Sequence, residues 1–140
     1  MHECERIKSK GGFTLTELLI VISILAILAV LVYPSWVDSL RKARRTDAIQ
    51  SLLDVRANQA QWRANHTTYA TSLTDVGYAS GTSRDGHYTI AFVGTPNATT
   101  FTVTAAPAGG QSSDDCGTYA INQDGPDQTG SYADAGCWNQ

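Results

Sequence analysis

An apolar run near the N-terminus limits what this chain can fold into more than any other feature. Between Phe13 and Tyr33 the only charged residue is Glu17, and every residue from Leu18 to Val32 except Ser23 is apolar. A helix needs about 20 such residues to cross the hydrocarbon core of a bilayer. The run therefore predicts a membrane-spanning helix. In a chain of 140 residues it leaves material for one modest domain in water.

The sequence changes character after Pro34. Apolar residues now recur at steps of mostly three or four between polar and basic ones, which is the pattern of an amphipathic helix. If this helix is continuous with the apolar run, it extends from Phe13 to about Asn65, roughly 80 Å. Pro34 removes a backbone donor and crowds the carbonyl of Val30, so we expect a bend or a locally melted turn there. The apolar positions are Trp36, Val37, Leu40, Ala43, Ala48, Leu52, Val55 and Trp62.

Short strands are expected in the C-terminal half. Beyond His66, glycines and prolines separate runs rich in Thr, Tyr, Val, Phe and Ile, and we place strands near 87–93, 99–105 and 118–122. Short turns between them favour an antiparallel sheet. The expected fold class is therefore α+β. A long N-terminal α-helix, with a membrane-spanning half and an amphipathic half, packs against a small antiparallel β-sheet.

The cysteines suggest what holds the C-terminal segment. Cys116 and Cys137 follow the apolar run and Cys4 precedes it. Insertion with the N-terminus inside would place the first two in an oxidising compartment and Cys4 in a reducing one. A small head that is short of large aliphatic residues usually needs a cross-link. A disulfide between Cys116 and Cys137 would close a loop of about 22 residues and contribute roughly 3 kcal/mol; the alternative is two free thiols.

The segment before the apolar run has the composition of a removable leader. It reads MHECERIKSKGG, is polar and basic, and ends in two glycines. An ordinary secretory signal carries its small-residue cleavage site after the apolar stretch, and no such site follows Val32. A lipoprotein is disfavoured because its acylated cysteine would also follow the apolar segment. We therefore expect the leader to be removed and the apolar helix to be retained.

The boundary between these two segments resembles the processing site of type IV pilins and the related pseudopilins. It reads GFTLTE from Gly12 to Glu17, with the apolar run starting at once. The resemblance implies that prepilin peptidase, a membrane-embedded aspartic peptidase, cleaves between Gly12 and Phe13 and methylates the new N-terminal Phe13. It also implies that Glu17 is the fifth residue of the mature chain and that Pro34 marks the helix bend of the family.

The C-terminal segment is similar to the disulfide-bounded segment of the PilE-type minor pilins, a family that also includes DNA-uptake minor pilins. The matching residues are CGTYAIN from Cys116, DG at Asp124 and CW at Cys137, with Tyr69 and a Gly-Tyr pair at Gly77 after the helix. The resemblance implies a cleaved leader over 1–12 and a transmembrane or filament-core helix over 13–34. The amphipathic half of the helix would follow over 35–65, and a globular β-sheet head with a C-terminal disulfide-bounded segment over 66–140.

The function implied by the resemblance is that of a structural subunit, a minor pilin, of a type IV pilus that supports pilus biogenesis, adhesion or twitching motility. Its expected partners are other pilin subunits, prepilin peptidase, inner-membrane lipids and the pilus assembly machinery. The precursor would sit in the bacterial inner membrane with its N-terminus cytoplasmic and its head periplasmic, and then join the pilus on the cell surface. The alternatives are a pseudopilin of a type II secretion system, which the terminal disulfide segment disfavours, and a pilus-borne DNA-uptake receptor or adhesin.

A basic cluster just after the apolar run complicates the orientation. Basic residues normally mark the cytoplasmic side of a membrane helix, so hydropathy alone leaves the orientation open, and the resemblance decides it. We expect the cluster to meet lipid head groups or neighbouring subunits. It comprises Arg41, Lys42, Arg44 and Arg45.

Glu17 needs a partner because a carboxylate in a lipid-facing helix costs about 2.5 to 3.5 kcal/mol on insertion scales. Cleavage after Gly12 would create an ammonium at Phe13, and in a helical assembly that amine could meet Glu17 of a neighbouring subunit and fix the axial register. The alternative is local: Thr14 and Glu17 have the spacing of a capping box at the start of the helix. We favour the pairing between subunits, because capping alone does not explain a charge beside so many apolar positions.

The charge of the head argues against nucleic acid as a partner. From Thr67 onward the only basic side chain is Arg84, against seven aspartates, which gives a formal charge of −6. DNA affinity depends largely on cations that neutralise phosphates, so the charge disfavours a DNA receptor unless an unusual stacking site compensates.

No enzymatic, metal or cofactor site is expected either. The loop from Asn122 to Asp127 loosely resembles a calcium loop but lacks the distal bidentate glutamate, and a tight turn is the favoured interpretation. His2, His66 and His87 are isolated, without ligand spacing. We find no nucleophile with a paired base and no phosphate-binding glycine loop.

Overall fold

The computed structural model describes residues 12–139, and these fall into two compact units. The first ends at Val37 and the second begins at Asp38. Helix α1 (Leu15–Arg63) contributes residues to both units. The leader expected over 1–12 therefore lies outside the described residues except for Gly12.

Helix α1 begins where the sequence offers a cap and continues through Pro34. Thr14 lies just before the helix, and its hydroxyl accepts the backbone N–H of Glu17 at 3.2 Å. The locally melted turn considered at Pro34 is absent, because the helical conformation is unbroken from Leu15 to Arg63. A proline can remain inside a helix when the loss of one backbone hydrogen bond is tolerated. The bend at Pro34 stays a prediction.

The head contains a sheet of three antiparallel strands, β1 (Tyr88–Phe92), β2 (Thr102–Pro107) and β3 (Tyr119–Asn122), in the order β1-β2-β3. The expected strands were nearly in place, but β2 begins three residues later than expected. The reason is a turn at Asn97, whose Oδ1 accepts the backbone N–H groups of Thr99 and Thr100 at 2.8 and 2.9 Å. A side chain that satisfies its own backbone in this way favours a turn over a strand.

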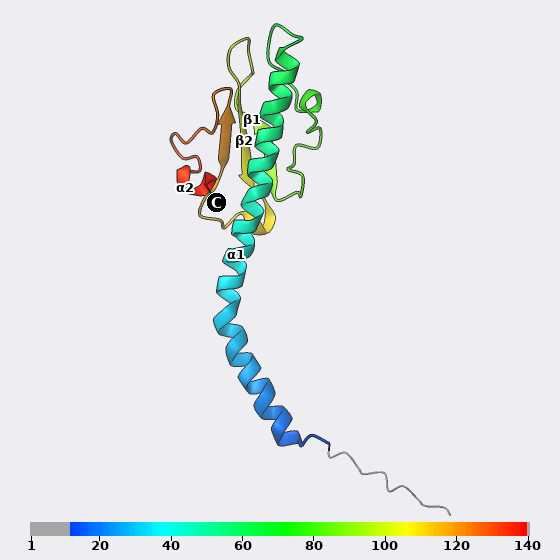
Figure 1. Ribbon diagram of the computed structural model, residues 1–140, viewed down its shortest axis with the longest axis vertical. Helices are drawn as coiled ribbons and strands as arrows, with labels where there is room; N and C mark the ends of the chain where they lie inside the picture. Colours follow the sequence, from blue (N-terminus) through cyan, green and yellow to red (C-terminus); the bar gives the residue numbers. More distant parts are fainter. Residues whose placement is uncertain (1–11, 140) are drawn as a thin grey trace, which may run out of the picture. The chain divides into compact units, whose positions relative to one another are not determined.

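The C-terminal part of α1 packs against this sheet (Figure 1). Ala48, Leu52 and Val55 of the helix are fully buried and share one core cluster with side chains of all three strands. In the register of the sheet, Ile90 lies opposite Ala105 and Val103 opposite Ile121. These four residues belong to that cluster. The structure thus confirms the α+β fold class.

Short elements complete the head and hold its C-terminal segment. They are the 3-10 helices η1 (Thr74–Val76) and η2 (Gly109–Gln111) and the short helix α2 (Ala135–Trp138). Asp134 caps α2 by accepting the backbone N–H of Cys137 at 3.0 Å. The segment before α2 lies along the outer edge of β3, where Ala133 donates its N–H to the carbonyl of Thr118 at 2.9 Å. Asp127 also donates its N–H to the carbonyl of Ala120 at 2.9 Å, so the chain after β3 covers the open edge of that strand.

Candidate functional site

The N-terminal half of α1 presents an apolar surface that nothing in the described structure covers. Every large apolar side chain from Phe13 to Tyr33 is at least half exposed. Among the described residues, α1 is the one helix long and apolar enough to cross a membrane by length and composition. Exposed apolar area on this scale indicates a surface that contacts lipid or protein.

Glu17 lies near the start of this surface and beside Phe13. Both residues line a shallow hollow with Leu18 and Val21. Only half of the capping box is formed, because Thr14 binds the backbone N–H of Glu17. No hydrogen bond or ion pair to the Glu17 carboxylate occurs among residues 12–139. The cap therefore involves the backbone N–H of Glu17 and not its carboxylate.

A buried ion pair joins α1 to the loop between η2 and β3. The Nε and Nη2 atoms of Arg45 donate to the carboxylate of Asp114, at 2.9 Å to Oδ2 and 2.5 Å to Oδ1. The side chains are 9% and 1% exposed. The hydrogen bond to Asp114 raises the pKa of Arg45, which stays charged. A two-pronged contact of this kind fixes both side chains in one geometry.

Polar side chains extend this buried network toward the sheet. Gln111, fully buried, donates from Nε2 to the hydroxyl of Tyr88 and to the backbone carbonyl of Arg41, both at 3.0 Å. Burial raises the pKa of Tyr88 to about 12. Burial also raises the pKa of Tyr119, whose ring packs edge-on against Tyr88. The network is neutral apart from the ion pair and remains so over the physiological pH range.

A second buried carboxylate, Asp47 on α1, organises the loop before β1. It accepts the hydroxyl of Ser83 at 2.5 Å and the backbone N–H groups of Asp85 and His87 at 3.1 and 3.3 Å. The Ser83 hydroxyl in turn accepts the N–H of Tyr88 at 3.0 Å. One helix side chain thereby supplies the hydrogen-bond acceptor for two backbone N–H groups of this loop.

The disulfide joins Cys116 to Cys137, with their Cα atoms 5.8 Å apart. This distance lies in the ordinary range for a disulfide. Tyr119 strengthens the same junction: its hydroxyl donates to the carbonyl of Cys137 at 3.2 Å, and its ring meets Trp138 edge-on. The expected cross-link is thus confirmed, and it holds α2 against the core.

The loop after β3 is a tight turn, as expected. Asn122 accepts the N–H groups of Asp124 and Gly125 through Oδ1, and its own N–H donates to the carbonyl of Gly125 at 2.9 Å. Asp127 directs one carboxylate oxygen to the hydroxyl and N–H of Thr129. These oxygens serve the backbone of the loop. Within residues 12–139 no group of three or more His, Cys, Asp or Glu side chains has the arrangement of a metal site.

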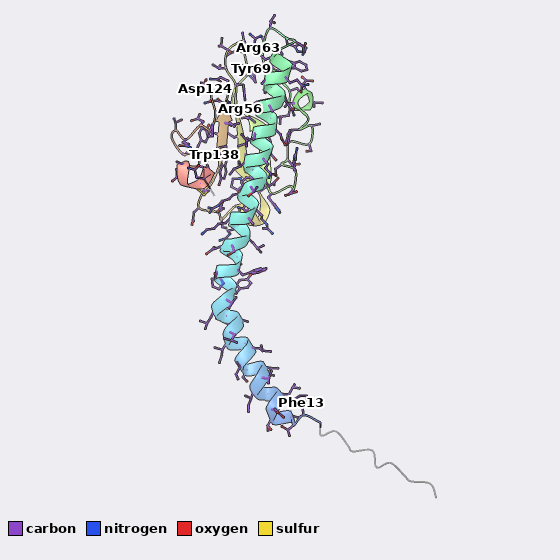
Figure 2. The ribbon with its side chains drawn as sticks, viewed as in Figure 1. Phe13, Arg56, Arg63, Tyr69, Asp124 and Trp138 are labelled. Carbon is purple, nitrogen blue, oxygen red and sulfur yellow. A yellow bond between two sulfur atoms is a disulfide. The ribbon has the colours of Figure 1, made fainter. Side chains whose placement is uncertain are left out.

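A hollow on the head, here called the Arg56 hollow, combines a cation with aromatic rings. It has a volume of about 300 Å³, and its lining includes Arg56 of α1, Tyr69 and Phe101. Figure 2 labels Arg56 and Tyr69 on the head. The Arg56 guanidinium donates to the carbonyl of Gln123 at 3.1 Å. Phe101 is buried and packs edge-on against Tyr69. The hollow could accept a ligand that has both a flat ring and a negative charge.

Comparison with known families decides what kind of protein carries these features. The profile described as "Type IV minor pilin ComP, DNA uptake sequence receptor" matches residues 34–120, more than half of the chain. The chain belongs to the type IV minor pilins of the ComP family. A second profile, the prokaryotic N-terminal methylation motif, matches residues 7–33 of this pilin. The two matches together cover the leader boundary, α1 and most of the head.

The pilin is also similar to two curated proteins over part of their length. It is 35% identical over 77 residues to a fimbrial protein of Neisseria meningitidis serogroup A / serotype 4A, a match that covers 55% of this chain and 45% of the relative. It is also 35% identical over 77 residues to the type IV major pilin protein PilE of Neisseria gonorrhoeae, covering 55% and 46%. The match spans about half the length of these relatives. The profile matches confirm the family expected from the sequence. Type IV pilins are structural proteins of surface filaments.

The expected basic cluster after the apolar run needs correction. Arg45 is not available to lipid or to other subunits, because it is buried against Asp114. Arg41 is partly buried and lies 3.3 Å from Asp38. The sequence alone could not separate them, because the four basic residues occupy nearly every position of a single helical turn and only packing decides which face turns inward. Lys42 stays exposed.

Several residues that organise the head were not expected from the sequence. Asp47 and Gln59 lie on the amphipathic helix among polar neighbours, yet both are buried. Gln59 makes two hydrogen bonds at 2.8 Å to the backbone of Ala70 and so fixes the chain after the helix. The available signal was spacing for Gln59, which lies four residues after Val55 and seven after Leu52 and so shares their helical face. Asp47 lies four residues before the buried polar Ser51, which gave no apolar signal.

Proposed function

We propose that this pilin is inserted in the inner membrane as a precursor, cleaved between Gly12 and Phe13, methylated on Phe13 and assembled into a type IV pilus. Residues 1–12 act as the leader and 13–34 as the membrane helix, which becomes part of the filament core. Residues 35–65 form the amphipathic half of the helix, and 66–140 form the head on the filament surface. The partners are prepilin peptidase, inner-membrane lipids, the assembly machinery and other pilin subunits.

One observation carries this proposal: an exposed apolar helix surface bears a single carboxylate, Glu17, that has no partner within the described residues. An unpaired charge in a low-dielectric core is costly. A partner must therefore come from outside the chain as described. The methylated ammonium of Phe13 in an adjacent subunit supplies the opposite charge at the same level of the helix.

The proposed orientation places the N-terminus in the cytoplasm and the head in the periplasm. The Cys116–Cys137 disulfide supports it, because such bonds form and persist in oxidising compartments. The pilin then reaches the cell surface when the filament grows. Its role is structural, in pilus biogenesis, adhesion or twitching motility, and the proposal includes no catalytic activity.

Substitution at Glu17 tests the proposal. Glu17→Leu should leave membrane insertion intact and lower the ratio of pilin in sheared pili to pilin in the inner membrane by at least about tenfold, because the neighbour's ammonium loses its counter-ion. Thr14→Ala is the matched control, since it removes the observed cap and keeps the charge, at a cost of about 1 kcal/mol in the helix. A ratio for Glu17→Leu equal to wild type would refute the pairing, as would an equal defect in Thr14→Ala.

A second candidate function, DNA binding by the head, is favoured by the Arg56 hollow and by the printed description of the ComP family. The formal charge of −6 counts only residues after Thr67. Arg56 and Arg63 belong to α1 but bind carbonyl groups of the head, at Gln123 and Ala98. The folded head is thus less acidic than that count suggests. Arg56 beside Tyr69 offers the charge and the ring that a nucleotide requires.

Binding of a 20-base-pair DNA duplex to the purified full chain would test this second candidate, with fluorescence anisotropy followed over a series of salt concentrations. If DNA binds in the hollow, Arg56→Gln should weaken binding and reduce the salt slope by about one, whereas Arg84→Gln, outside the hollow, should have less effect. Absence of binding at low salt would exclude this function and leave the structural role intact.

A further inference from the structure

A second hollow lies at the C-terminal end of α1, and it differs in chemistry from the Arg56 hollow. It has a volume of about 380 Å³, within the range of small-molecule sites. The two hollows share none of their lining residues. We call this second one the Trp62 hollow. Its polar and aromatic lining residues are Asn58, Gln61, Trp62, Asn65, His66 and Asp75.

A stacked pair of rings forms the flat wall of the Trp62 hollow. The rings of Trp62 and His66 are nearly parallel, at an angle of 5°, and their centroids lie 3.8 Å apart. Trp62 is partly buried against the core of the head, which holds the pair in place. Because each ring covers the inner face of the other, the stack offers a ligand its outer face and its ring edges, and such a face can pack against the C–H groups of a ring.

The polar groups around this wall are mainly acceptors. His66 directs Nδ1 to the carbonyl of Trp62 at 2.9 Å, so Nδ1 carries the proton and Nε2 of the neutral ring is an acceptor. Asn58 donates from Nδ2 to the carbonyl of Val76 at 2.9 Å, which leaves its Oδ1 as the acceptor. Asp75 adds an exposed carboxylate. The amide of Gln61 can both donate and accept.

The charges and hydrogen-bonding groups of the Trp62 hollow indicate which class of ligand fits it. No lysine or arginine lines the hollow among the described residues, and the one full charge, on Asp75, is negative. Phosphate groups and nucleic acid, which require cations, are therefore poor ligands here. A ligand that fits must supply several hydrogen-bond donors and one apolar face. A sugar ring has both, because its hydroxyl groups donate and its C–H groups can pack on the aromatic wall.

A neighbouring polar hollow gives room for more than one sugar unit. It has a volume of about 410 Å³ and shares Asn58 and Gly77 with the Trp62 hollow. Gly77 adopts a positive φ of 84°, which favours glycine. A Cβ at this position would lie 3.7 Å from Nδ2 of Asn58. That distance is an ordinary van der Waals contact, so the positive φ, and not a lack of space, favours glycine where the two hollows meet.

We propose that the Trp62 hollow binds an uncharged sugar unit of a glycan, with Asn58, Gln61 and Asp75 contacting its hydroxyl groups and the Trp62–His66 pair contacting its C–H face. This goes beyond the structural role, because it gives the head a ligand of its own. It does not depend on DNA binding, which concerns a different hollow.

Titration of the 15N-labelled full chain with galactose and with N-acetylglucosamine tests the proposal. The chain is held in a polyoxyethylene detergent, which carries neither a sugar nor a quaternary amine. The indole N–H signal of Trp62 should shift and saturate at millimolar concentrations of at least one sugar. Gln61→Ala should weaken that binding about fivefold, the effect of losing one hydrogen bond. Gln50→Ala, an exposed glutamine on α1 outside the hollow, should leave it unchanged.

Three results would overturn the proposal. The first is no saturable shift of the Trp62 signal with either sugar up to about 50 mM, well above the weak millimolar range of affinity. The second is equal binding by wild type and Gln61→Ala, with the melting temperature of the variant showing that it is folded. The third is binding of choline and not of the sugars, which would identify a cation site formed by Trp62 and Asp75.

Discussion

The buried pair of Arg45 and Asp114 gives the sharpest prediction for the stability of the head. Asp114→Asn keeps the size of the side chain and removes its charge, so the Arg45 guanidinium remains buried without a counter-ion. The two side chains are only 9% and 1% exposed, and two guanidinium nitrogens bind the carboxylate. Removal of one partner of such a pair costs about 3 to 5 kcal/mol. Asparagine keeps one acceptor, so we expect the lower end, about 3 kcal/mol.

Urea and thermal unfolding of the full chain in detergent, followed by tryptophan fluorescence, would measure this loss. For a head of this size, about 3 kcal/mol corresponds to a fall in melting temperature of at least about 10 °C. Asp115→Asn is the matched control, because Asp115 is the next residue and is exposed. The double substitution Arg45→Leu, Asp114→Leu should recover much of the loss, since an apolar pair leaves no buried charge. A loss in Asp114→Asn no larger than in Asp115→Asn would refute the reasoning.

Three further predictions concern the same head. The unfolding free energy should fall as pH rises from about 10 to about 12. The reason is that burial raises the pKa of Tyr88 from 10.0 to about 12, so the folded state favours the neutral phenol by about 3 kcal/mol. This contribution to stability is complete below pH 10 and lost above pH 12. An unchanged urea midpoint over this range would contradict the prediction. Reduction of the Cys116–Cys137 disulfide should lower the unfolding free energy by roughly 3 kcal/mol, for a sequence separation of 21, and an equal urea midpoint with and without reductant would count against this. Asp47→Ala should cost at least about 2 kcal/mol, because a hydroxyl and two backbone N–H groups lose their acceptor; amide exchange over 83–88 should accelerate, and unaltered exchange would show that Asp47 does not hold this loop.

The elements that periodicity and composition specify could be predicted from the sequence. The apolar run and the amphipathic pattern after Pro34 predicted a helix close to α1, and the turn residues placed three strands. The pairing of Cys116 with Cys137 followed from the compartment argument and from the resemblance to the minor pilins. These features depend on local pattern or on a simple count, and so they survive without knowledge of tertiary packing.

The features that the sequence could not predict depend on contacts between distant residues. Arg45 and Asp114 are 69 positions apart, and each resembles its exposed neighbours in composition. The same holds for Asp47, whose role requires a loop 36 to 40 positions away. The charge count for the head missed Arg56 and Arg63, because they belong to the helix in sequence and to the head in space. Folding onto α1 changes which charges share a surface.

The mass of the chain recovered from sheared pili shows whether this protein is processed and assembled as a pilin. We expect the pilin to be present in purified filaments. It should begin at Phe13, carry one added methyl group on that residue and contain the oxidised Cys116–Cys137 pair, with fragmentation locating the methyl group on the N-terminal amine. Recovery from the filaments of a chain that retains residues 1–12, or of one cut after the apolar run, would contradict the proposed processing and assembly. So would a chain that is abundant in the inner membrane and absent from the filaments of a piliated cell.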